Sequence, residues 1–112
     1  MIILYGIKNC DSCKKARKWL DLNKIDYIYH DIRINGLDAM ILGEWSSTIN
    51  LESLLNRRST TWRKLSKTDK QRINNENIIH YFLTYPTLIK RPIIKYKNTI
   101  FVGFDPEIFS RQ

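Results

Sequence analysis

The order of hydrophobic patterns along the chain restricts it to few folds. Residues 1–5 read as a short buried strand that ends at Gly6, residues 11–23 have the spacing of an amphipathic helix, and residues 26–32 alternate as a second strand. A strand, a helix and a strand within one sheet imply a parallel pair joined by a crossover. The chain therefore begins as an α/β protein.

The remaining sequence changes character twice. Apolar residues recur at helical spacing over residues 37–85, which predicts three or four short helices. Residues 92–96 and 99–103 then read as two strands joined by the turn Lys97-Asn98, and a short helix follows from Asp105. This order predicts an α/β thioredoxin-like fold with a small mixed sheet. We expect a single domain over residues 1–112, with a helical insertion at about 37–85.

The chain has two cysteines, Cys10 and Cys13, and both lie where the first predicted strand passes into the first predicted helix. Unpaired N–H groups and the positive end of the helix dipole stabilise a thiolate at such a position. Cys10 is therefore the predicted nucleophile. Cys13 lies one helical turn further on, from where it can reach back and resolve a mixed disulfide.

Other uses of the pair are less well supported. A structural zinc site needs four ligands, and His30 and His80 lack the paired spacing of a zinc finger. A structural disulfide would close a loop of only a few residues and add little stability. Cys13 can also be a small apolar helix residue without a redox role, so its function stays open at this point.

A second predicted element of the site is the pair Arg91-Pro92, at the start of the hairpin. Open α/β sheets place their sites at the carboxyl ends of parallel strands, where this pair would face the Cys10 loop. We predict that the Arg91-Pro92 peptide bond is cis and that backbone is exposed there to an extended thiol substrate. An ordinary trans proline at the start of a strand is the alternative.

The charge balance, 19 Lys and Arg against 11 Asp and Glu, gives a net charge of +8 and suggests a nucleic-acid ligand. Isoleucine outnumbers valine 17 to one, however, which is typical of an AT-rich genome that also enriches lysine codons. We therefore expect no direct nucleic-acid binding. Positive residues near the thiols, such as Lys14 and Arg17, instead favour a thiolate and anionic partners.

Six segments carry a resemblance to a known family. They are YGIKNCD at residues 5–11, KKA at 14–16, DIR at 31–33, LLNRRSTTWRKL at 54–65, PTLIKRPI at 86–93 and VGF at 102–104. Their order and spacing resemble those of the arsenate reductase (ArsC)/Spx family, and most closely its YffB-like branch. The resemblance covers essentially the whole chain.

The resemblance implies a thioredoxin-like fold with a helical insertion, a nucleophilic cysteine in the first loop, and an arginine before a cis-proline. These correspond to Cys10, Arg91 and Pro92, while Arg58 resembles a further family arginine. Asn56 stands where arsenate reductases have their first anion-binding arginine, and no arginine lies near Gly103, where their third is expected. The resemblance thus favours a thiol-disulfide reductase over an arsenate reductase.

We therefore expect a thiol-disulfide reductase, coupled to glutathione as co-substrate and without a tightly bound cofactor or metal. Cys10 would attack a disulfide, Lys14 and Arg91 would stabilise negative charge, and Cys13 or an external thiol would resolve the intermediate. In related folds the position of Asp105 holds the α-amino end of glutathione. As a plain helix cap, Asp105 would need no ligand.

The alternative is a redox-sensing transcription regulator of the Spx kind. Spx-type proteins carry a C-x-x-C and bind the α subunit of bacterial RNA polymerase, and a disulfide between Cys10 and Cys13 would be the corresponding switch. For either function we expect a monomer. We also expect it to be cytoplasmic and without membrane contact, because no apolar stretch approaches the roughly 20 residues of a membrane span and no signal-peptide pattern is present.

Overall fold

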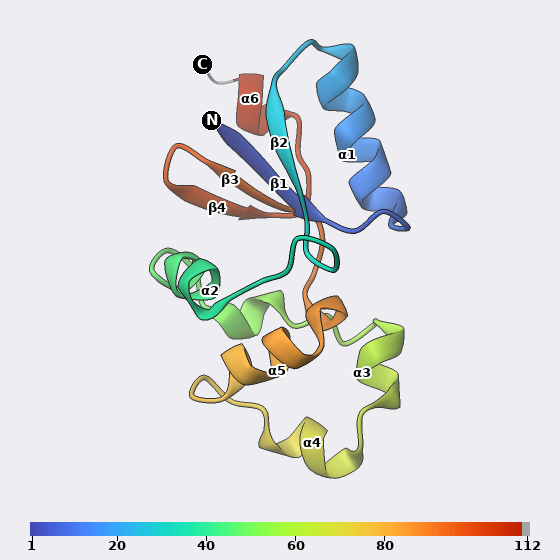
Figure 1. The fold of residues 1–112 in the computed structure, drawn as a ribbon, viewed down its shortest axis with the longest axis vertical. Coiled ribbons are helices and arrows are strands. Elements are labelled where there is room, and N and C mark those ends of the chain that lie inside the picture. Colours follow the sequence, from blue (N-terminus) through green and yellow to red (C-terminus); the bar gives the residue numbers. More distant parts are fainter. Residues whose placement is uncertain (111–112) are drawn as a thin grey trace. The chain divides into compact units, whose positions relative to one another are not determined.

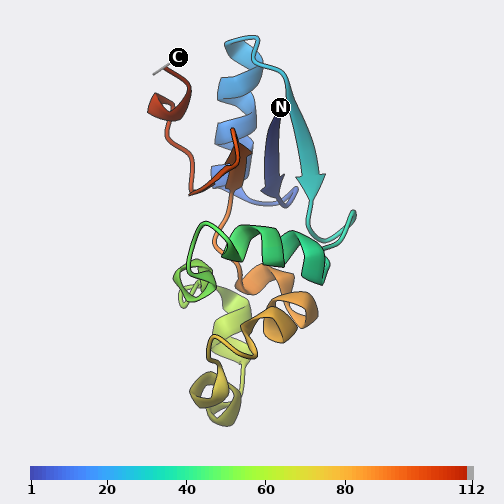
Figure 2. The same cartoon turned by 90° about the vertical axis from the view of Figure 1, so that its left-hand side faces the viewer.

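The computed structural model describes residues 1–110, which form two compact units. The first unit comprises Met1–Asn35 and the chain from Arg91 onward, and the second comprises Gly36–Lys90. Figures 1 and 2 show that the first unit contains the sheet and that the second is helical. The predicted insertion is thus a compact unit of its own. That the two units make up a single domain stays a prediction.

The sheet of the first unit has the strand order β2-β1-β3-β4. Strand β1 (Ile2–Gly6) pairs in parallel with β2 (Tyr27–Asp31) and antiparallel with β3 (Ile93–Tyr96), which pairs antiparallel with β4 (Thr99–Val102). Lys97 and Asn98 both have positive φ, 50° and 61°, as a two-residue hairpin turn requires. The predicted parallel pair and hairpin are confirmed.

Helix α1 (Asp11–Leu22) packs against the sheet through an apolar stripe. Cys13, Ala16 and Leu20 are buried at the spacing of successive helical turns, and Ala16 and Leu20 form a core with Ile2, Leu4 and Ile94. The helix ends in a turn at Lys24, whose φ is +55°, and the N–H of Ile25 then donates to the Leu20 carbonyl at 3.0 Å. This packing fixes α1, and the cysteines at its start, against β1.

Aromatic rings extend this core toward the C-terminal helix α6 (Glu107–Ser110). The Trp19 ring lies 5.5 Å from Phe104 and 6.0 Å from Phe109, measured between ring centroids. Trp19 is half-buried at the edge of this core. Offset aromatic pairs at these separations add stability beyond the area they bury.

The second unit consists of short helices. Its α-helices are α2 (Ala39–Ser46), α3 (Thr60–Lys64), α4 (Lys67–Arg72) and α5 (Ile78–Thr84), and its 3₁₀ helices are η1 (Leu51–Leu54) and η2 (Pro86–Leu88). Asp38, Ser59 and Ser66 each accept a hydrogen bond from an N–H in the first turn of the helix that they precede, at 2.8 to 3.0 Å. Caps this close together in the sequence keep α3 and α4 short.

The buried side chains of the second unit form its own core. Trp45, Leu54, Ile78, Phe82 and Leu88 all have a relative exposure of 0%. Two backbone hydrogen bonds, from Asn56 to Leu88 and from Lys90 to Leu54, both 2.7 Å, join the segment after η1 to the segment after α5. The element order and the mixed sheet together confirm the predicted thioredoxin-like fold with a helical insertion.

Candidate active site

Cys10 is the N-cap residue of α1. Its backbone is extended, with φ −128° and ψ 118°, and its carbonyl accepts the first hydrogen bond of the helix from the Lys14 N–H at 2.9 Å. The side chain is half-buried and its thiol is free. A sulfur at this position lies beside the unpaired N–H groups of the first turn, which favour a negative charge.

Cys13 lies one turn further on and is buried, with 1% of its surface exposed. Its Sγ packs against Gly6 at the end of β1, so closely that a Cβ added to Gly6 would lie 2.6 Å from the sulfur and 3.2 Å from the Cys13 Cβ. Only glycine leaves room for this thiol. Gly6 is a residue of the site that sequence reasoning treated merely as the end of a strand.

We expect Gly6→Ala to lower the free energy of unfolding by about 1–3 kcal/mol, because the new methyl group overlaps the buried Cys13 sulfur and the structure must shift to separate them. Urea unfolding under reducing conditions measures the loss. The same substitution in a Cys13→Ala background should cost clearly less, since the overlapping Sγ is gone. Equal losses in the two backgrounds would contradict the proposed contact.

Arg91 directly precedes Pro92, and the peptide bond between them is cis, as predicted. The Pro92 carbonyl accepts a hydrogen bond from Gly103 at 2.8 Å, which ties the start of the hairpin to its end. Arg91 is half-buried and lies within interaction distance of Cys10. The structure therefore brings together Cys10, Cys13 and Arg91, as the sequence suggested.

The surroundings of Cys10 favour its thiolate. Burial raises the pKa of the Cys10 thiol, but the backbone N–H and the thiol of Cys13 and the guanidinium of Arg91 together outweigh it and hold the pKa below the ordinary value. The Cys13 N–H does not complete a regular capping hydrogen bond with the sulfur, so it acts as a nearby dipole. More of Cys10 is thus ionised at neutral pH than of an isolated cysteine.

Cys13 has the opposite character. Burial, together with the hydrogen bond to Cys10 and the negative charge of the Cys10 thiolate, raises the pKa of Cys13 to about 12, although the backbone N–H of Ile7 and the charge of Arg91 act against it. A thiol with such a pKa is almost fully protonated at neutral pH and is therefore a poor nucleophile. Within the pair, Cys10 is the reactive thiol.

The other predicted cations lie on separate elements. Lys14 is exposed on α1, and Arg58 is exposed in the second unit, before α3. Arg17, expected among the positive residues around the thiols, lies over the Tyr29 ring with its Cζ 3.9 Å from the ring centroid, and its Nε donates to the Tyr27 hydroxyl at 3.3 Å. The lowered pKa of Cys10 is accounted for by Cys13 and Arg91.

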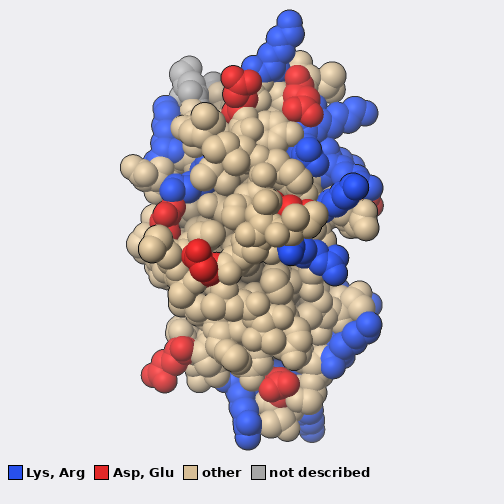
Figure 3. Space-filling view, viewed as in Figure 1, with Lys and Arg blue, Asp and Glu red and all other residues tan. Residues whose placement is uncertain are grey.

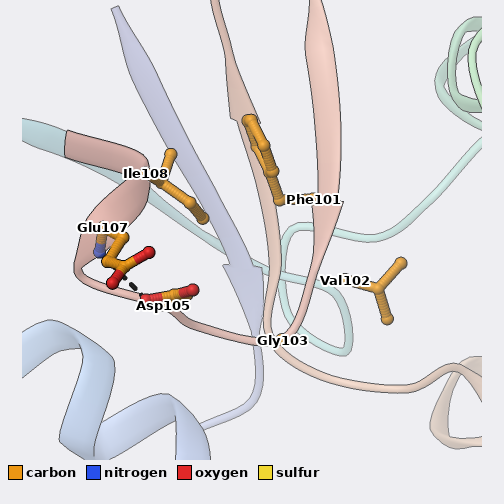
Figure 4. Close-up of a pocket in the computed structure, with 6 residues that line it drawn as sticks. All are labelled: Phe101, Val102, Gly103, Asp105, Glu107 and Ile108. Atoms are coloured by element: carbon orange, nitrogen blue, oxygen red, sulfur yellow. Dashed lines mark hydrogen bonds between the residues drawn. The ribbon is translucent and has the colours of Figure 1, made fainter. Parts of the chain in front are cut away.

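Asp105 lies in a pocket of about 390 Å³ within the first unit (Figure 4). Its Oδ1 accepts a hydrogen bond from the Glu107 N–H at 2.9 Å and so caps α6. The residues that line the pocket are Phe101, Val102, Gly103, Asp105, Glu107 and Ile108. The cap is therefore present, and the pocket adds two carboxyl groups beside apolar side chains. A positively charged amine is the group that such a lining would favour.

Within residues 1–110, no group of three or more His, Cys, Asp and Glu side chains is arranged to hold a metal ion. In the same range, no helix has both the length and the apolar character that crossing a membrane requires.

Comparison with known proteins gives consistent matches over the whole chain. Residues 5–111 match the ArsC family. An uncharacterised protein of Haemophilus influenzae is 42% identical over 105 residues, which cover 94% of this chain and 92% of that protein. The solved structure of a protein named YFFB superimposes with a TM-score of 0.89 at 38% identity and covers 99% of this chain and 97% of its own.

A more distant relative has a regulatory name. The global transcriptional regulator Spx of Streptococcus pneumoniae is 31% identical over 109 residues, which cover 96% of this chain and 81% of the regulator. The similarity thus extends to a class of protein whose name describes control of transcription.

Proposed function

The chain belongs to the ArsC family, and on that premise we propose that it is a thiol-disulfide reductase whose Cys10 thiolate attacks a mixed disulfide of glutathione. The observation that carries the proposal is the position of Cys10 at the N-cap of α1, with its pKa lowered by Cys13 and Arg91. A thiolate formed in this way at neutral pH is the nucleophile of thiol-disulfide exchange.

In the first step, the Cys10 thiolate attacks the glutathionyl sulfur of the substrate. A bond forms between Cys10 Sγ and that sulfur, the substrate disulfide breaks, and the released thiolate takes a proton from solvent. The substrate is reduced, and Cys10 carries glutathione. The positive charge of Arg91 stabilises the thiolate before the attack.

In the second step, the thiolate of free glutathione attacks the glutathionyl sulfur on Cys10. Oxidised glutathione leaves, and the Cys10 thiolate is restored. A leaving thiol of low pKa departs faster, so Arg91 assists this step as well. The net reaction consumes one glutathione for each mixed disulfide reduced, and no bound cofactor takes part.

We assign the second step to glutathione because of the environment of Cys13. Burial is the largest cause of the raised pKa of Cys13, and burial persists after Cys10 has lost its negative charge in the mixed disulfide. Cys13 therefore supplies little thiolate for an internal attack. We propose that it serves mainly to stabilise the Cys10 thiolate, as one of the groups that lower the pKa of Cys10.

We further propose that Lys14 and Pro92 contact the substrate. Lys14 is an exposed cation that would attract a carboxylate of glutathione. Arg58, an exposed cation of the second unit, stays a predicted substrate-binding residue. Pro92 adjoins Arg91, and its carbonyl is held by the hydrogen bond from Gly103. The protein is proposed to act as a monomer.

Turnover of a mixed disulfide between glutathione and mercaptoethanol tests the proposal. Glutathione is supplied as reductant, and its oxidised form is followed through NADPH consumption by glutathione reductase. The proposal predicts a rate proportional to the concentration of this protein and well above the uncatalysed exchange. A rate equal to the uncatalysed exchange would overturn it.

Asp105 provides a separate prediction about glutathione. Its carboxylate caps α6 and lies in an acidic pocket that would accept the α-ammonium group of glutathione. Asp105→Asn keeps an oxygen that can cap the helix but removes the charge, so we expect KM for glutathione to rise several-fold while kcat and stability stay close to wild type. Steady-state kinetics measure both constants. An unchanged KM would leave Asp105 as a helix cap only.

A redox-sensing regulator is a second candidate, favoured by the 31% identity with Spx and by the closeness of Cys10 and Cys13. Oxidation would join the two thiols and change binding to the α subunit of RNA polymerase. A pull-down with the C-terminal domain of that subunit, under reducing and under oxidising conditions, tests it. Binding that follows the thiol state, without reductase turnover, would replace the enzyme proposal.

A further inference from the structure

The positive charge of the chain is concentrated in one segment of the helical unit. Residues 57–72 contain seven Lys and Arg residues and a single acidic residue, Asp69, while the whole chain has a net charge of +8. Six of the seven are exposed: Arg57, Arg58, Arg63, Lys64, Lys67 and Arg72. Among them, only Arg58 is a predicted substrate-binding residue of the reductase. We call residues 57–72 the basic segment.

The one acidic residue of the segment offsets only one of its seven positive charges. The Asp69 carboxylate is half-buried and accepts a hydrogen bond from the Tyr81 hydroxyl in α5 at 3.0 Å. This hydrogen bond joins α4 to α5. Figure 3 shows Lys and Arg side chains projecting from the region where Figure 1 draws α3 and α4. The basic segment therefore presents a surface of one dominant sign.

A tryptophan organises part of this surface. The Arg57 Cζ lies 5.5 Å from the Trp62 ring centroid, and the Lys70 Nζ lies 5.6 Å from it. Arg57 comes from the loop before α3, Trp62 from α3 and Lys70 from α4. Cations at this distance over an indole ring are attracted to it, so the half-buried ring holds two positive groups from separate elements in one cluster.

This arrangement indicates the chemistry of a partner. A nucleic acid would be expected to stack its bases on an exposed ring, but cations already lie over Trp62. Arginine and tryptophan are the residues that most often anchor protein–protein contacts, and an arginine fork binds a carboxylate with two hydrogen bonds. We propose that the Arg57–Trp62–Lys70 cluster, within the basic segment, docks an acidic segment of a partner protein.

Fluorescence anisotropy with a labelled peptide of alternating Glu and Ala tests this surface. Arg57→Gln combined with Lys70→Gln should weaken binding about tenfold at low salt. The matched control, Lys18→Gln with Lys97→Asn in the first unit, removes the same charge and should change the affinity less than about twofold. Equal losses in the two variants would mean that only net charge matters, and would overturn the proposal.

A charge-neutral variant and a second probe complete the test. Trp62→Leu removes no charge but releases Arg57 and Lys70, so it should weaken peptide binding several-fold while circular dichroism shows the fold retained. Unchanged binding by a folded Trp62→Leu protein would contradict the role of the cluster. An oligothymidylate with the same number of charges should bind less tightly than the peptide, and tighter binding would replace the acidic protein with a nucleic acid.

Discussion

Replacing Cys10 by serine is expected to reduce reductase turnover at least about a thousandfold. Serine is close to cysteine in size and fits the same N-cap position, so the fold should be retained. Its hydroxyl does not ionise near neutral pH, however, and cannot form the mixed disulfide on which the second step depends. Turnover of the mixed disulfide between glutathione and mercaptoethanol measures the loss, and circular dichroism checks the fold.

Cys13→Ser is the matched control. It removes the other thiol from the same turn of α1 but keeps a hydroxyl that can donate toward the Cys10 sulfur. Because glutathione is the proposed resolving thiol, this variant should retain turnover within about threefold of wild type. If Cys13→Ser is as inactive as Cys10→Ser, Cys13 resolves the intermediate and the single-thiol mechanism is wrong. If Cys10→Ser keeps full activity, the nucleophile has been misassigned.

Replacing Arg91 by alanine is the second change with a large expected effect. The Arg91 guanidinium lowers the pKa of Cys10 through both a hydrogen bond and its charge, so its removal should raise that pKa toward the ordinary thiol value of about 8.5. At neutral pH the Cys10 thiolate fraction, and with it the alkylation rate, should fall about tenfold. The rate of iodoacetamide alkylation against pH, measured in a Cys13→Ser background, reports the change on Cys10 alone.

The pH dependence gives the sign of the effect. Because the pKa of Cys10 is lower with Arg91 present, its thiol ionises at a lower pH there than in Arg91→Ala. The alkylation rate of Arg91→Ala should therefore fall furthest behind below the ordinary thiol pKa. Above roughly pH 9.5 both proteins are ionised and the two rates should converge. Arg91→Lys keeps the charge but loses the planar fork, and should give an intermediate curve. Superimposable curves for wild type and Arg91→Ala would show that Arg91 does not act on Cys10.

The first unit was largely predictable because its local signals agree with its packing. Alternating and helical apolar patterns mark β1, α1 and β2, and Lys97-Asn98 occupies a turn that needs two positive φ angles. The Arg91-Pro92 pair could be placed because a proline before a central strand has few compatible positions. In each case a short stretch of sequence determines its own conformation.

The helical unit was predictable only as helical. Its helices are short because capping residues such as Ser59 and Ser66 follow one another closely, and their ends depend on packing in the unit's own core. The contact of Lys70 with Trp62 joins two separate helices and has no signal in the local sequence. Apolar periodicity alone therefore could not place these ends or this contact.

The same limit applies to the candidate site. Cys10 could be identified as the nucleophile from its place before a helix. The sequence could not show that Cys13 is a buried thiol with a raised pKa. Its high pKa depends on burial and on the close packing of its sulfur against Gly6. That packing arises from the way α1 lies on β1, and the spacing C-x-x-C is the same for a resolving thiol and for a buried one.

Mass spectrometry most directly tests the central claim, that Cys10 carries the glutathionyl group during turnover. The Cys13→Ser variant is mixed with the glutathione mixed disulfide in the absence of reductant, quenched with acid and mapped by peptide digestion. The account predicts one glutathionyl adduct, on Cys10, which added glutathione removes at least as fast as the enzyme turns over. No adduct on Cys10, or an adduct removed more slowly than turnover, would contradict it.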